Sequence, residues 1–317
     1  MNRPVAGDPD RMSDSSDTAG GTIGGHAHLL ISMAARAPSV HNTQPWRFRV
    51  GPDTAELWSD PRRKLRADPS GREMLISCGA ALFGLRLAVR SLGYLPVNSL
   101  EHQMLDAVPH RHTHRGPFAP GPLPHGLLAG LQHDALAEGA TLTLVTGGLA
   151  YGRLEQIAAA AARRQGADPR TRAEIRRWTR IAADTARDGI PVTALASSTG
   201  RPAGRLPQRD FDLGRGITHL PSGGAPPAAT AVLLTPGDRR ADWLRAGQAL
   251  YRLLLHAASQ GVSASLYTQP LEDAVTRNLI SSQLALLGRP QILLQLGRAA
   301  TASPTARRLP DEPDTPC

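Results

Sequence analysis

The most specific stretch of this sequence is Ala37-Pro38-Ser39-Val40-His41-Asn42-Thr43-Gln44-Pro45-Trp46. Its polar side chains lie between Pro38 and Pro45, whose rings restrict the backbone on either side. Such a segment can present backbone N–H groups and the Asn42 amide to the edge of a heterocycle, because an amide holds a donor and an acceptor in one plane. The alternative is a turn that ends a helix, with Asn42 as a local cap. These residues alone favour neither interpretation.

A second polar stretch is Arg111-His112-Thr113-His114-Arg115. In an extended backbone Arg111, Thr113 and Arg115 point to one face. Paired guanidiniums and a hydroxyl on one face suit a phosphate, because arginine stays charged and offers a planar fork of donors. A solvated basic strand edge is the alternative, and the charge pattern alone favours it.

An internal repeat is the main sign of organisation. Residues 78–95 can be laid over 246–263 without gaps, and the matched pairs include Gly79/Gly247, Ala81/Ala249, Leu82/Leu250, Leu85/Leu253, Leu87/Leu255, Ser91/Ser259 and Gly93/Gly261. Two unrelated Ala- and Leu-rich helices that both end in glycine would look similar. A duplicated unit is the sharper interpretation, and it predicts one repeat over 27–109 and another over 110–310.

Both polar stretches resemble motifs of FMN-dependent nitroreductases. Residues 38–46 are similar to the P-S-x-x-N-x-Q-P-W motif, and residues 111–115 to the R-x-S-x-R motif with Thr in place of Ser. The resemblance implies an α+β, nitroreductase-like fold with FMN as cofactor. It also implies that Asn42 contacts the flavin ring, that Pro38 and Ser39 contribute from the same turn, and that residues 44–46 set the backbone path.

The same resemblance implies a phosphate site. Arg111, Thr113 and Arg115 would hold the FMN phosphate and ribityl chain. In the C-terminal basic segment, Arg308 is the better match to a family residue that also reaches the phosphate, with Arg307 as the fallback. A phosphate with nearly two negative charges calls for two or three cationic partners, which these arginines would supply.

The loop expected at 266–269 occupies the place where the family donates a backbone N–H to flavin N5. Leu266, Thr268 and Gln269 are therefore candidate cofactor contacts. No acid–base side chain is identified, because in such enzymes the cofactor carries the chemistry and the protein binds and orients it.

The way in which the two motifs are divided between the halves of the sequence predicts how one site is assembled. The first half carries the motif with Asn42, and the second half carries the motif with Arg111 and Arg115, so each chain holds one complete set. This implies a nitroreductase dimer fused into one polypeptide, as in the Acg-like family. The resemblance to that family covers about 27–310 and includes residues 178–180, 188–191, 210–213 and 269–271. In that family the insert at about 165–227 acts as a lid across the flavin.

Composition narrows the kinds of partner and site that we expect for this protein. The net charge is +9, but Lys64 is the only lysine. Such an arginine excess is typical of a GC-rich coding sequence, so nucleic-acid binding is disfavoured. A zinc site on residues 110, 112 and 114 lacks a nearby acidic or Cys partner. Cys78 and Cys317 do not predict a disulfide framework, which is typical of a cytoplasmic protein.

The tails and the hydropathy give further expectations. No run of 18 apolar residues predicts a membrane span, and residues 1–26 lack the apolar core of a secretory signal. We expect 1–26 to be a disordered leader and 311–317 to be a tail.

Periodicity predicts the local structure. Helices are expected at 28–36, 74–92, 127–136, 151–187 and 241–260, strands at 46–50, 55–58, 141–145, 229–234 and 291–296, and a strand followed by a helix start at 97–105.

Two functions from different classes remain open. The first is an oxidoreductase that transfers hydride from NAD(P)H through FMN to a nitroaromatic, quinone or similar small acceptor, and the superfamily favours it. The alternative is FMN storage beneath a closed lid, without turnover. A flavin-free interaction protein is a third class. The choice of NADH or NADPH, and of a monomer or a homodimer of fused chains, stays open.

Overall fold

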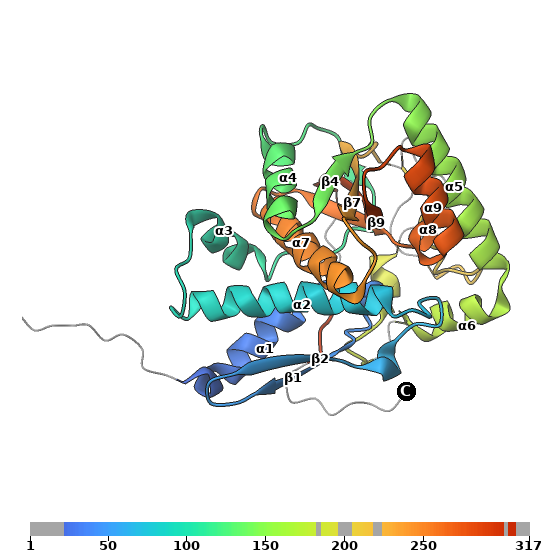
Figure 1. Cartoon of the computed structure of the whole chain (residues 1–317). Helices are drawn as coiled ribbons and strands as arrows, with labels where there is room; N and C mark the ends of the chain where they lie inside the picture. The colour runs from blue at the N-terminus through green and yellow to red at the C-terminus, as the bar shows by residue number, and fades with distance from the viewer. Residues whose placement is uncertain (1–21, 182–184, 196–204, 218–223, 301–303, 309–317) are drawn as a thin grey trace, which may run out of the picture.

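The computed structural model describes residues 22–181, 185–195, 205–217, 224–300 and 304–308. The elements are α1 (Ala27–Ala35), β1 (Trp46–Val50), β2 (Ala55–Ser59), α2 (Arg72–Ser91), α3 (Ser99–Ala107), β3 (Phe118–Ala119), α4 (Leu127–Ala137), β4 (Thr141–Leu144), α5 (Gly148–Ala167), α6 (Pro169–Arg177), β5 (Thr179–Arg180), β6 (Ile190–Pro191), β7 (Ala229–Thr235), α7 (Arg240–Ser259), β8 (Ser263–Tyr267), α8 (Gln269–Glu272), α9 (Ala274–Gln283) and β9 (Arg289–Ala299). Helices and an antiparallel sheet share one body (Figure 1), which confirms the α+β class.

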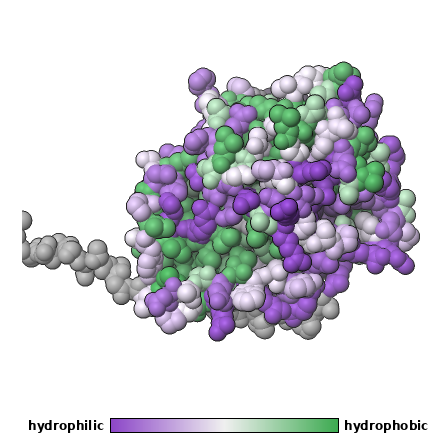
Figure 2. All heavy atoms as spheres, in the orientation of Figure 1, coloured by the Kyte–Doolittle hydropathy of each residue, from purple (hydrophilic) through white to green (hydrophobic). Residues whose placement is uncertain are grey.

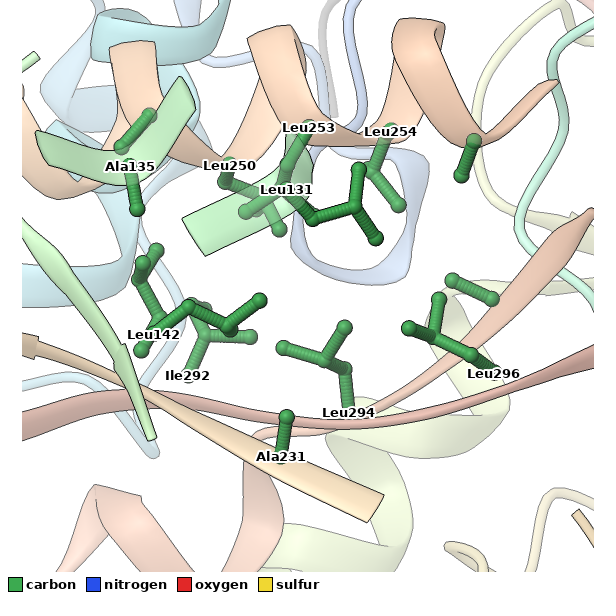
Figure 3. Packing of buried hydrophobic residues seen from close by; sticks show 14 of the residues in the cluster. Leu131, Ala135, Leu142, Ala231, Leu250, Leu253, Leu254, Ile292, Leu294 and Leu296 are labelled. Atoms are coloured by element: carbon green, nitrogen blue, oxygen red, sulfur yellow. The ribbon is translucent and has the colours of Figure 1, made fainter. Parts of the chain in front are cut away.

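The sheet is built around β9. Its strand order is β3-β9-β7-β4, with β8 also paired to β9, and every pairing is antiparallel. Successive side chains of a strand point to opposite faces. Accordingly Ala231 and Leu233 of β7 pack in one apolar cluster with α4 and α7, whereas Val232 and Leu234 pack in another with α5 and α9. Figure 3 shows the first cluster, with α7 leucines above the sheet.

The two helices whose sequences align in the expected repeat, α2 and α7, cross each other (Figure 1). Their aligned glycines meet at the crossing. A Cβ atom on Gly79 would lie 2.2 Å from the carbonyl oxygen of Leu244, and one on Gly247 would lie 2.0 Å from that of Ile76. The backbones approach this closely because neither glycine has a side chain. The crossing agrees with a duplicated unit, and the duplication itself stays a prediction.

The first half holds no comparable sheet among the described residues. Its strands β1 and β2 form an antiparallel hairpin, and α1 packs on α2. Helix α2 is long and apolar enough to cross a membrane by length and composition, but it is a largely buried core helix here. Figure 2 shows the face seen in Figure 1, over which hydrophilic residues are spread widely and hydrophobic residues gather in patches.

Three expectations on local structure are wrong. The strand expected at 97–105 is absent, because the Asn98 side chain accepts from Glu101 N and forms a capping box that begins α3. The helical stretch at 151–187 is broken at Asp168, which caps α6 ahead of Pro169. Residues 266 and 267, expected in the loop at 266–269, belong to β8. The insert at 165–227 lies partly outside the described residues.

Candidate functional site

The loop at residues 37–46 has an unusual backbone. His41, Asn42 and Gln44 have φ values of 48°, 56° and 49°, in the left-handed region that favours glycine. Each such residue costs on the order of 1 kcal/mol and persists only where its surroundings hold it. The Ser39 hydroxyl accepts from Gln44 N at 3.0 Å and closes the turn, and buried Pro38 precedes it. Loops strained in this way are frequent at ligand sites.

Asn42 ties this loop to two distant segments. Its Nδ2 donates to Gly189 O at 2.9 Å and to Ala306 O at 3.0 Å. These contacts rule out the alternative of a local helix cap. Its Oδ1 is buried and has no hydrogen-bond partner among the described residues. The amide nitrogen of Asn42 therefore donates to the protein, whereas the amide oxygen is open to accept a hydrogen bond from another molecule.

The stretch at 111–115 lies beside β8. Thr113 bridges Ala264 in parallel, and His114 N donates to Ala264 O at 2.8 Å. Arg111 is only 7% exposed, so the alternative of a solvated basic edge does not hold for it. Burial and then the charge of Arg111 lower the pKa of Arg115, whereas the buried His114 ring contacts Phe118. The charges of Arg111 and Arg115 thus act on each other, and a phosphate held by both stays a prediction.

The C-terminal segment adds one arginine to this group. Arg111 and Arg115 are among the charges that lower the pKa of Arg307. Arg308 instead donates through Nη2 to Gln44 O at 2.8 Å and to Trp46 O at 3.2 Å. The geometry therefore favours Arg307, the fallback of the sequence comparison, over Arg308 as the third member. Arg308 holds the strained loop in place.

These three guanidiniums form a concentrated positive charge, which we call the arginine cluster (Arg111, Arg115 and Arg307). Burial lowers the pKa of Arg115 to about 10 and that of Arg307 to about 9, so both stay cationic at neutral pH. Arg111 Nε and Nη1 and Arg307 Nε are buried without hydrogen-bond partners in the described part of the chain. Grouped, desolvated cations with open donors are chemically suited to a phosphate.

A segment of the insert, residues 205–213, lies against both stretches. Arg205 Nη2 donates to Arg115 O at 3.1 Å, and Leu206 N donates to Gln295 Oε1 at 3.2 Å. Phe211 places its ring edge-on to His41, with centroids 5.3 Å apart. Sequence reasoning missed His41 as a site residue, although it is the ring at the centre of the motif.

The segment that follows β8 differs from the expected loop. Leu266 lies within β8 opposite Leu294 and packs against the core, so its assignment to a loop is wrong. Thr268 and Gln269 follow the strand, where Gln269 begins α8. Gln269 Oε1 is buried without a partner among the described residues, so it remains a candidate contact.

Next to this turn lies a pair of buried carboxyl groups that sequence reasoning also missed. Glu272 forms an ion pair with Arg209 of the insert, and Glu73 accepts from Arg72 Nη2 at 3.0 Å. Burial and the charge of Glu272 raise the pKa of Glu73 to about 8. The only sign of this carboxyl pair in the sequence is that two charged residues, 72 and 73, stand next to each other within an apolar helical pattern.

Comparisons with known proteins find relatives that match most of this chain. The Mycobacterium tuberculosis protein provisionally named NAD(P)H nitroreductase Rv3131 is 34% identical, over 88% of this chain and 88% of its own length. The chain belongs to the nitroreductase superfamily. Another relative from that organism, provisionally named NAD(P)H nitroreductase acg, is 28% identical over 85% of this nitroreductase and 88% of its own length. The Acg resemblance noted from the motifs is thus confirmed.

Two solved structures are similar at low identity. An FMN-bound nitroreductase from Desulfitobacterium hafniense is 13% identical, covers 65% of this nitroreductase and 94% of its own chain, and has a TM-score of 0.39. One from Bacteroides fragilis, also with bound FMN, is 12% identical, covers 70% and 98%, and has a TM-score of 0.39. No protein-family profile matches this nitroreductase.

Proposed function

We propose that this nitroreductase binds one FMN and passes electrons from NAD(P)H to a small acceptor such as a nitroaromatic or a quinone. The observation that carries the proposal is the arginine cluster, together with the open acceptor of Asn42 on the adjoining loop. A phosphate offsets the repulsion among the guanidiniums. The buried Asn42 Oδ1 suits the ring N–H on the pyrimidine side of a flavin.

In this proposal the protein residues bind, orient and exclude water. The arginine cluster holds the phosphate, and Thr113 lies between Arg111 and Arg115 in the sequence. The strained loop holds Asn42 rigidly, since Arg308 and Ser39 both bond to Gln44. When bound, FMN supplies the hydride chemistry. The chain positions the ring without needing an acid–base group of its own.

FMN storage is the second candidate, and one observation favours it. Residues 205–213 contact the arginine cluster through Arg205 and the strained loop through Phe211. If this segment stays closed, nicotinamide cannot stack on the ring; if it opens, it excludes water during turnover. The fused-repeat arrangement is supported by the contact between Gly79 and Gly247. It would give each chain a complete site, whether the protein is an enzyme or stores FMN.

Anaerobic stopped-flow absorbance separates the two candidates. Protein loaded with FMN is mixed with NADPH and then with NADH, and the flavin band is followed. We expect bleaching within seconds and reoxidation by a quinone. A flavin that dithionite reduces but neither nicotinamide reduces would overturn the enzyme and leave storage. A protein that retains no FMN after incubation with excess FMN and gel filtration would overturn both.

A further inference from the structure

The His41 ring is buried without the contacts that a buried imidazole normally makes. The residue is 6% exposed, and both ring nitrogens lack hydrogen-bond partners among the described residues. A buried polar group without a partner costs about 1–3 kcal/mol. His41 also has a φ of 48°, which adds backbone strain. The fold therefore holds a costly residue at the centre of the candidate site, which points to a contact with a ligand.

The charges around the ring restrict what that ligand can be. Burial lowers the pKa of His41 well below its ordinary value, and the charges of Arg209 and Arg115 lower it further. The ring is therefore neutral, with one N–H donor and one acceptor nitrogen. A guanidinium on the insert and another on the 111–115 stretch make its surroundings positive. An oxygen that carries or develops negative charge fits this environment, and a cationic ligand does not.

The position of the ring connects it with the electron acceptor. His41 directly precedes Asn42, whose open acceptor marks the proposed flavin edge. The His41 ring also contacts the ring of Phe211 in the insert, at an interplanar angle of 75°. His41 thus adjoins Asn42 along the chain and contacts the insert through Phe211. In the proposed function, a small molecule stacked on the flavin would lie beside this ring.

We propose that the neutral His41 ring donates a hydrogen bond to an oxygen of the electron acceptor, a nitro or quinone carbonyl oxygen, while Phe211 holds the ring in orientation. This inference rests on the proposed FMN-dependent function. A neutral imidazole is an effective donor to an oxygen that gains negative charge, and it stabilises that charge without first losing a proton to solvent.

The first test compares variants in steady-state assays. His41→Ala and His41→Gln are prepared with His133→Gln as the matched control, since His133 is exposed. We expect FMN affinity within about twofold of the parent, and kcat/KM for 1,4-naphthoquinone and nitrobenzene reduced about tenfold or more in His41→Ala. His41→Gln should recover part of the loss because its amide keeps a donor. Reduction of ferricyanide, which needs no such hydrogen bond, should hardly change.

The second test needs no turnover. Benzoate, a redox-inert molecule with acceptor oxygens, is titrated into FMN-loaded protein and followed through the flavin absorption. We expect benzoate to bind about tenfold more weakly to His41→Ala than to the parent or to His133→Gln. Ring ¹⁵N NMR of the parent should show a His41 shift on benzoate addition, so the inference stays testable even if His41→Ala folds poorly.

The outcomes distinguish this inference from the function on which it rests. Failure to bind FMN would overturn both. FMN-loaded protein whose His41 signal shifts on FMN addition, and not further with benzoate, would show that the ring contacts the flavin and would overturn the inference alone. The same holds if neither addition shifts the signal, because the ring would then be structural or bound only to water.

Discussion

Gly247 contacts Gly79 so closely that a Cβ atom on Gly247 would lie 2.8 Å from the Gly79 Cα. The added methyl would also meet the Ile76 carbonyl oxygen. We therefore expect Gly247→Ala to destabilise the protein by about 1–3 kcal/mol, although alanine is intrinsically the better helix former. Chemical denaturation gives the value.

Gly152 in α5 is the matched control for this substitution, since nothing lies within 4 Å of a Cβ added there. Gly152→Ala should be neutral or stabilise the protein by up to about 1 kcal/mol. Equal effects at both glycines would contradict the close-contact explanation.

Substitutions in the arginine cluster should weaken FMN binding. We expect Arg111→Ala, Arg115→Ala and Arg307→Ala each to cost about 1.5–3 kcal/mol of binding free energy, because each removes a charge-assisted hydrogen bond to phosphate. Fluorescence titration with FMN measures the effect. Arg153→Ala, an exposed position on α5, is the control. Unchanged affinity in all three variants would remove the phosphate assignment.

Asn42→Ala should change both the flavin and the fold. Losing Oδ1 should shift the flavin absorption or its reduction potential more than it changes FMN affinity. Losing Nδ2 removes the bonds to Gly189 O and Ala306 O, so stability should fall by about 1–2 kcal/mol. Spectroscopy with redox titration and thermal melting test the two parts separately. A variant with the parent's spectrum and potential would argue against a ring contact.

Glu73 should make stability depend on pH. Its pKa is raised to about 8 in the folded protein, from an ordinary value of 4.5, so folding takes up a proton between these values. Its stabilising contribution is present below about pH 4.5 and is lost as pH rises through 8, with a slope of at most about 1.4 kcal/mol per pH unit. Glu73→Gln should therefore lose less stability than the parent between pH 6 and pH 9.

Thermal melting at several pH values measures this dependence, with Glu56→Gln on the exposed side of β2 as the control. Parallel pH profiles for the parent and Glu73→Gln would show that Glu73 is ionised in the folded protein.

Much of the fold was predictable because burial leaves a periodic pattern. Helices α2 and α7 and the apolar strands β7 and β9 came directly from that pattern. Strand β8 did not, since Ser263, Ala264 and Ser265 are small or polar and show little hydropathy contrast. It is a strand because β9 offers a hydrogen-bonding edge along its length. That condition belongs to tertiary structure, which local sequence does not report.

The site was predictable in part for a similar reason. Motif spacing identified Asn42, Arg111 and Arg115, and the structure brings their segments to one place. The choice between Arg307 and Arg308 depends on which way neighbouring side chains turn, and the sequence motif does not specify that direction. The pairing of Arg209 with Glu272 joins segments 63 positions apart and leaves no local pattern.

The backbone of Arg308 is hydrogen-bonded to the Gln44 side chain, 264 positions earlier in the chain. The strained loop therefore receives one of its supports from a segment that folds back over a long stretch of chain. Formation of the candidate site is thus a long-range event in folding, which contacts within residues 37–46 do not complete on their own.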